Sequence, residues 1–184
     1  LTSIAAIGLN TTAGGATTLD GDLTATGALT VSSDGTIDIG LGSAGALMLQ
    51  GASALIEATN GTAANAVVTI GDADSAVAVT STATTVDILA NDGSVALANG
   101  AVTGQTDVAV NANVGVTINA TIQSGAGGGG GDLNITADLN GGGGDLLFQS
   151  ASSLDQDGGA NTLILQGASV DLGALTSATA EGAV

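Results

Sequence analysis

Short runs that alternate apolar residues with small or polar ones recur along nearly the whole chain. Examples are Leu29–Val31, Val77–Val79, Val108–Val110 and Val114–Ile118. Residues two apart point to the same side of an extended segment, so this period of two is typical of strands with one buried face. Gly and Asp-Gly pairs between the runs supply turns, and no stretch shows sustained helical spacing. The chain is therefore predicted to be all-β.

One phrase occurs three times and suggests a repeat. Leu47–Ser53 reads LMLQGAS, Leu163–Ser169 reads LILQGAS, and Leu146–Ser152 is a looser copy, LLFQSAS. Two copies begin 17 residues apart, at 146 and 163, and strand centres elsewhere fall at similar intervals. The repeat unit is thus about 17 to 21 residues, a spacing typical of solenoids. We predict a β-solenoid, similar to a parallel β-helix, with coils of about 17–21 residues and about nine coils in all.

The supply of large side chains favours a solenoid over a sandwich. The chain has one Phe, one Met and no Trp or Tyr, whereas two packed sheets must fill a gap of about 10 Å. In a solenoid the coils hydrogen-bond to one another through the backbone, so a thin core of Leu, Ile and Val suffices. Pro, which would remove a ladder donor, is absent from the sequence. A β-sandwich or jelly roll, as in a pilin-like subunit, is the alternative.

The domain organisation is predicted to be one elongated repeat domain over residues 1–184. Gly-rich excursions at 125–131 and 141–144 are either loops from a coil or sites where the backbone packs closely against another subunit. We expect a loose tail at 176–184. The apolar segment Leu1–Ile7 does not look like a polar cap, and it could equally be a strand donated to a neighbour. Because the first residue is Leu, we expect a processed product or a section of a longer protein.

The charge of the chain excludes several partners. It has 17 acidic residues, no Lys, Arg or His, and a net charge of −17. Nucleic-acid binding through phosphate neutralisation requires Lys or Arg, as does attraction to anionic lipid. No apolar run approaches the roughly 18 residues of a membrane span, so direct membrane insertion is not expected. The acids are predicted to be solvated, protonated or matched by external cations.

The same inventory bears on catalysis. The chain lacks His, Lys, Cys, Tyr and Arg, which are the usual general bases, nucleophiles and oxyanion stabilisers. The acids are better explained as solvated turn residues than as a catalytic pair. We therefore predict that the protein is not an enzyme.

Metal binding is the remaining chemistry that the acids allow. Carboxylate and carbonyl oxygens are the ligands that Ca²⁺ prefers, and two Asp residues that flank one other residue in an extended segment point to the same side. Structural calcium is predicted at three Asp-x-Asp pairs, with solvated turns as the alternative and no other cofactor. The pairs are Asp20 with Asp22, Asp72 with Asp74, and Asp155 with Asp157.

The segment Leu19–Val31, LDGDLTATGALTV, resembles the repeats of filamentous-haemagglutinin-type adhesins. It is also similar to giant bacterial surface proteins built from β-strand repeats, and to phrases in phage tail fibres. This resemblance implies secretion, an elongated shape, adhesive or scaffolding roles, and a location outside the cell or on its surface.

Together these features predict an extracellular structural protein that self-assembles into a filament, tube or sheath through β-strand addition. Its main partner would be itself, with host or cell-surface glycans as further partners. The alternative is an excised section of a large secreted adhesin that acts as a binding or spacer module. A third hypothesis is a calcium-gated assembly, in which cations bridge acidic subunits.

Overall fold

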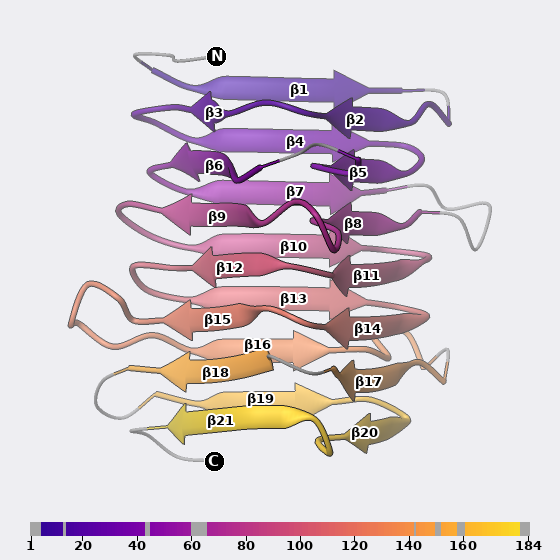
Figure 1. Ribbon diagram of the computed structural model, residues 1–184, viewed down its shortest axis with the longest axis vertical. Helices are drawn as coiled ribbons and strands as arrows, with labels where there is room; N and C mark the ends of the chain where they lie inside the picture. Colours follow the sequence, from indigo (N-terminus) through magenta and orange to yellow (C-terminus); the bar gives the residue numbers. More distant parts are fainter. Residues whose placement is uncertain are drawn as a thin grey trace.

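The computed structural model describes residues 5–12, 14–42, 45–59, 66–141, 143–149, 152–157 and 161–180. The described residues form 21 strands and no helix, and the strands lie in three sheets of seven strands each. Every pairing between strands is parallel, and the strands stack in chain order from the N-terminus to the C-terminus (Figure 1). The prediction of an all-β solenoid is therefore confirmed.

Three consecutive strands make one coil, and each contributes to a different sheet. Sheet 1 contains β1 (Ile7–Thr11), β4 (Leu29–Ser33), β7 (Ala54–Ala58), β10 (Val86–Ala90), β13 (Val108–Ala112), β16 (Leu133–Thr136) and β19 (Leu163–Gln166). Sheet 2 contains β2 (Thr17–Leu19), β5 (Ile37–Ile39), β8 (Val68–Ile70), β11 (Ser94–Leu97), β14 (Gly115–Ile118), β17 (Asp145–Phe148) and β20 (Ser169–Asp171). Sheet 3 contains β3 (Leu23–Thr24), β6 (Leu47–Gly51), β9 (Val77–Ser81), β12 (Gly100–Thr103), β15 (Thr121–Ser124), β18 (Ser152–Gln156) and β21 (Leu175–Ala180).

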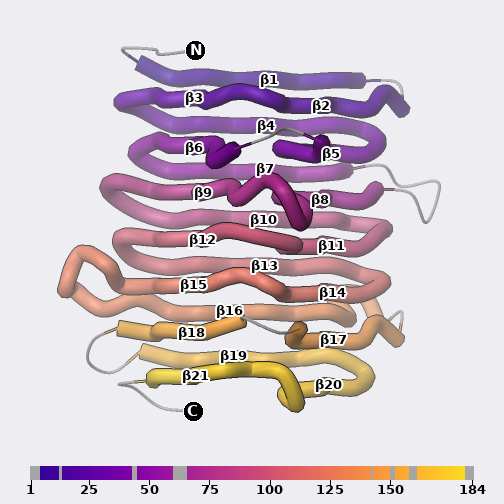
Figure 2. The backbone as a smooth tube through the Cα atoms, in the orientation of Figure 1, coloured from indigo at the N-terminus to yellow at the C-terminus, as the bar shows by residue number. Residues whose placement is uncertain are grey.

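The coils are longer and fewer than the sequence suggested. The backbone winds through seven coils, not about nine (Figure 2). Ile7 pairs with Leu29 one coil later, a step of 22 residues, whereas Ala54 pairs with Val86, a step of 32. The predicted coil of about 17–21 residues is therefore wrong, although the solenoid itself is confirmed.

The repeated phrase explains this error. Its three copies begin in β6, β17 and β19, which belong to sheets 3, 2 and 1 respectively. The copies never stack on one another, so the 17 residues between two of them measure a step from sheet to sheet. The phrase encodes a strand followed by a corner, a local unit that each side of a coil requires.

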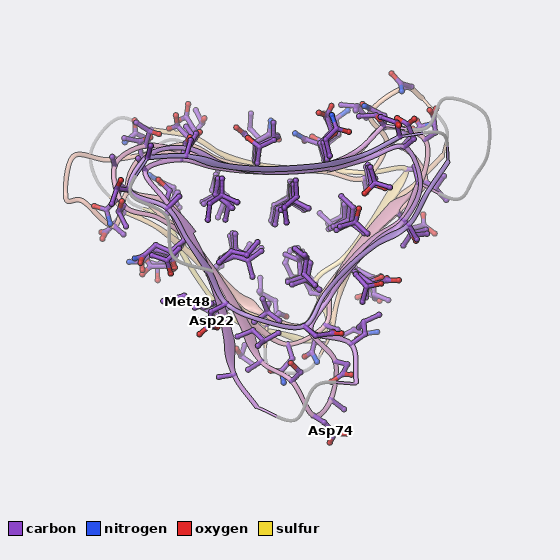
Figure 3. All side chains as sticks on the ribbon, turned by 90° about the horizontal axis from the view of Figure 1, so that it is seen from above. Asp22, Met48 and Asp74 are labelled. Atoms are coloured by element: carbon purple, nitrogen blue, oxygen red, sulfur yellow. The ribbon has the colours of Figure 1, made fainter. Side chains whose placement is uncertain are left out.

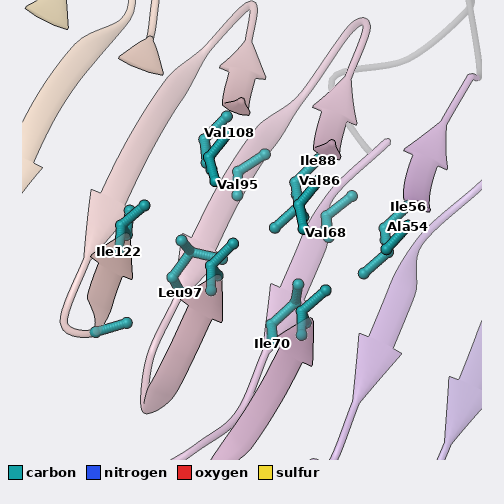
Figure 4. Packing of buried hydrophobic residues seen from close by; sticks show 14 of the residues in the cluster. Ala54, Ile56, Val68, Ile70, Val86, Ile88, Val95, Leu97, Val108 and Ile122 are labelled. Carbon is teal, nitrogen blue, oxygen red and sulfur yellow. The ribbon is translucent and has the colours of Figure 1, made fainter. Parts of the chain in front are cut away.

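The core is a set of side-chain columns inside a three-sided tube (Figure 3). Strand residues alternate between buried and partly exposed, as in the BiBiB pattern of β10. Ile88 of β10 stacks between Ile56 and Val110 in sheet 1, and all three are fully buried. Figure 4 shows such stacked side chains at close range. Phe148 is also buried, beside Ile118, so the chain's single aromatic residue fills the core.

Buried polar side chains lie near the corners, where they serve the backbone. The hydroxyl of Ser81 donates to the carbonyl of Ala52 at 2.8 Å, and that of Ser124 donates to the carbonyl of Gly131 at 3.1 Å. The side-chain amide of Gln156 donates to the same Gly131 carbonyl at 3.1 Å. Because a buried polar group without a partner is costly, these bonds allow the chain to turn at a corner without losing stability.

The Gly-rich segments occupy corners. Residues 125–131 join β15 to β16, and residues 141–144, of which 142 lies outside the described residues, join β16 to β17. A side chain at Gly131 would collide with the carbonyl oxygen of Thr106, and one at Gly144 with that of Ala137. The close backbone approach that the Gly runs suggested therefore occurs within the chain.

The two ends also differ from the sequence-based expectation. Residues 176–180, expected to be part of a loose tail, continue strand β21, which pairs with β18; residues 181–184 lie outside the described residues. The backbone ladder stabilises this segment despite its small, polar composition. At the other end, Ile7 begins β1, while residues 1–4 of the predicted cap-free segment are not among those described.

The columns predict a contrast between two neighbouring residues of β10. Ile88→Ala should cost about 2–5 kcal/mol in the free energy of unfolding, because it leaves a cavity in a buried column. Leu89→Ala, on the outer face of the same strand, should cost about 1 kcal/mol or less. Urea unfolding followed by circular dichroism measures both, and equal losses would contradict the inward and outward assignment.

A second contrast concerns the Gly run. Gly131→Ala should destabilise the protein, because the new methyl group meets backbone atoms of the preceding coil. Gly129→Ala is the matched control, since a side chain there meets nothing within 4 Å, and it should be neutral or slightly stabilising. Thermal unfolding of the two variants measures the difference. A Gly131→Ala variant as stable as the control would show that the corner is not tightly packed.

Candidate functional site

The C-terminal end of the solenoid exposes side chains that are buried elsewhere. Val170 follows Leu146 in a column of sheet 2, yet it is 40 % exposed whereas Leu146 is fully buried. In sheet 1, Leu165 pairs with the buried Ile135 but is only partly buried. Leu172, just beyond β20, is 48 % exposed. The core columns therefore open to solvent at this end, because no described coil covers them.

The N-terminal end presents the opposite ends of the same columns. Ile7 of β1 and Leu23 of β3 are 6 % and 7 % exposed, and Leu9 and Leu19 are partly buried against the core. This end is apolar as well, but less open than the C-terminal one.

Both ends also carry unmatched strand edges. Among the described strands, β1, β2 and β3 pair only toward the next coil, and β19, β20 and β21 only toward the preceding one. Backbone N–H and C=O groups on such edges are templates for another strand. Each end therefore offers three parallel edges around an apolar centre. The described residues enclose no pocket.

The predicted calcium pairs lie at separate places. Asp20 and Asp22 lie between β2 and β3, and Asp72 and Asp74 lie between β8 and β9, which is the same corner two coils further on. Asp155 lies within β18 and Asp157 directly follows it, with Gln156 buried between them. This last pair has the extended geometry that was expected. Figure 3 shows Asp22 beside Met48, and Asp74 at the tip of the corner.

The pair at Asp72 and Asp74 is not extended. The Asp72 carboxylate accepts hydrogen bonds from the backbone N–H groups of Asp74 and Ser75 at 2.9 and 2.8 Å, which folds the segment into a turn. It also accepts one from the N–H of Gly42, in the preceding coil, at 2.6 Å. The hydrogen bond from Gly42, followed by that from Asp74, lowers the pKa of Asp72 below its usual value. Asp72 thus stabilises the corner itself.

The described residues contain no group of three or more acidic side chains placed to share a metal ion. Calcium binding at the Asp-x-Asp pairs stays a prediction. Nor does the described part of the chain contain a helix that could span a membrane.

Several carboxylates instead accept hydrogen bonds from the next coil. Asp22 accepts from the N–H of Met48 at 2.8 Å, and Asp107 accepts from the N–H of Asp132 at 2.9 Å. Asp132 in turn accepts from both the N–H and the hydroxyl of Thr162, at 2.7 and 2.9 Å. These acids use neutral donors in place of cations, an arrangement that the sequence-based expectation of solvated or cation-matched acids omitted.

Hydroxyl groups form a second set of contacts between coils. Ser169 donates to Asp145 at 2.7 Å, and Thr59 donates to Asp34 at 3.1 Å. The sequence signal for these contacts is an acid and a donor separated by one coil length. That signal becomes readable only once the coil length is known.

No family model, curated protein or solved structure matches this chain. The resemblance of Leu19–Val31 to adhesin repeats therefore stays a prediction.

The corner at Asp72 predicts a pH-dependent contribution to stability. Because the pKa is lowered in the folded protein, the stabilisation is present above the unfolded value of about 3.9 and is lost as the pH falls below it. Asp72→Asn should lower the urea midpoint at pH 7, and the gap to the unsubstituted protein should narrow below about pH 4. Asp74→Asn is the control, since it removes one charge from the same corner without these hydrogen bonds. A gap for Asp72→Asn that does not change with pH would contradict the assignment.

Proposed function

We propose that the protein is an extracellular structural protein whose copies assemble into a filament, tube or sheath by β-strand addition. The observation that carries the proposal is the pair of uncapped ends. Each end has three unmatched strand edges among the described residues, and the C-terminal end leaves apolar side chains such as Val170 and Leu172 in solvent. Unmatched edges and exposed core both favour addition of another strand layer.

The fold suits such a role mechanically. A tube of parallel coils is held by backbone hydrogen bonds along its axis, so an added copy would extend the same ladder. Seven coils at about 4.8 Å each give a length of about 34 Å per subunit. Polar backbone groups buried at the junction would then be paired as they are between coils.

Uncapped ends also fit the second candidate, a spacer or binding section of a large adhesin. In that case further coils of a longer chain would cover the ends. The two candidates differ in behaviour, because only the first requires isolated copies to polymerise.

Charge sets the conditions for assembly. Each copy carries −17 with no cationic side chain, so approaching copies repel one another at low ionic strength. We therefore propose that salt promotes assembly by screening. The calcium-gated hypothesis instead requires divalent cations at the interface.

The test is negative-stain electron microscopy and light scattering of the purified chain at micromolar concentration, across sodium chloride concentrations, with calcium or with chelator. Filaments in both calcium and chelator, formed faster as salt increases, are expected for strand addition. Aligned filaments should give a meridional reflection near about 4.8 Å. Filaments that dissolve in chelator would favour calcium bridging, and a monomer under every condition would favour the spacer module.

A further inference from the structure

We infer that one copy stacks its C-terminal coil on the N-terminal coil of the next copy, head to tail and without a shift in register. This inference rests on the proposed self-assembly and specifies its interface. The junction would repeat the arrangement between β16 and β19 inside the chain, with a second copy of this protein as the partner.

In sheet 1, an unshifted junction places β19 of one copy beside β1 of the next. The first inward column begins at Ile7 and ends at Leu163, so Leu163 would pack on Ile7. Leu165 would likewise pack on Leu9, which begins the second column. Both columns would continue with residues of the size and polarity found along their length.

Sheets 2 and 3 agree with the same register. Val170 ends the column that begins at Thr17, so these residues would meet across β20 and β2. Ala178 ends the column that begins at Leu23, which brings β21 onto β3. The three sheets are joined by corners, so one register must satisfy all of them at once, and this one does.

The outward residues avoid contact between like charges. Asp171 would lie beside Thr18, which begins its column. Asp22 would lie beside Ser177, because its neighbour Met48 begins the column that leads to Ser177. Acid beside hydroxyl is the pairing that the chain already uses between its own coils, at Asp145 and Asp34. In a junction without cationic side chains, this pairing supplies hydrogen-bond donors to both carboxylates.

Other arrangements lose these matches. A slip of one residue turns every side chain to the other face, which would set Leu165 against Gly8 or Asn10 and bury polar surface. A tail-to-tail pair would bring the Asp171 residues of both copies into one interface, and it would close as a dimer without growing.

Disulfide trapping tests the register, because the chain has no cysteine of its own. Gln166 and Asn10 are exposed and end up opposite each other in the proposed junction, as do Ile164 and Gly8. Directly opposed strand residues lie about 4.8 Å apart, inside the Cα separation that a disulfide allows. The two matched double variants are Asn10→Cys with Gln166→Cys, and Gly8→Cys with Ile164→Cys.

The control swaps partners among the same four positions. Gly8→Cys with Gln166→Cys, and Asn10→Cys with Ile164→Cys, leave the two thiol-bearing residues offset by two positions along the strand, about 8 Å apart, too far for a disulfide. Each full-length variant is first examined for filaments under reducing conditions. It is then oxidised with copper phenanthroline in air and run on a non-reducing gel.

We expect both matched variants to form ladders of covalent multimers that dithiothreitol reverses, and both swapped variants to lose the ladder. Ladders in the swapped variants, or dimers as the main product of the Gln166→Cys single variant, would overturn the inference while filaments still supported the proposed function. Filaments without ladders in either matched variant would also overturn it. Absence of both filaments and ladders would overturn the proposed function and the inference together.

Discussion

The parallel hydrogen-bond ladder between successive coils is the interaction on which the rest of the structure depends. Each strand pairs with the strand one coil before and one coil after it, so the backbone supplies cohesion that large side chains supply in other folds. The core then needs only columns of Leu, Ile and Val, such as the one through Ile88. The ladder has no intrinsic limit, which is why its two ends are the sites where function is sought.

The ladder also explains how a chain with 17 acids and no basic residue can fold. Neighbouring coils bring backbone N–H and hydroxyl groups next to carboxylates, as at Asp132 and Asp145. These charge-assisted hydrogen bonds stabilise the charged form without a cation. Residual repulsion between acids of adjacent coils is left to solvent and dissolved ions. The acids thus belong to the junctions between coils, and the same chemistry is available at a junction between copies.

The fold class was predictable because alternation is a local property. Val108–Val110 and Leu133–Ile135 are recognisable as strands from their own residues, and each is a strand in the structure. Coil length was not predictable, because the repeated LxLQ phrase marks one side of a coil and its copies lie on three different sheets. The candidate site was less accessible still. The Asp-x-Asp pairs were visible as a pattern, but at Asp72 the turn, which the pattern does not specify, directs the carboxylate toward backbone donors.

The sequence by itself determined that this protein is built from short strands around a thin core, since period-two alternation and the lack of aromatic residues leave few other solutions. Only the tertiary structure decided which residues stack, because pairing depends on how many residues each corner takes up, from 22 to 32 per coil as shown by the partners of residues 7 and 54. That count decides that Asp145 lies beside Ser169 and that Val170 ends a core column in solvent. Contacts between coils are long-range, and no local pattern encodes them.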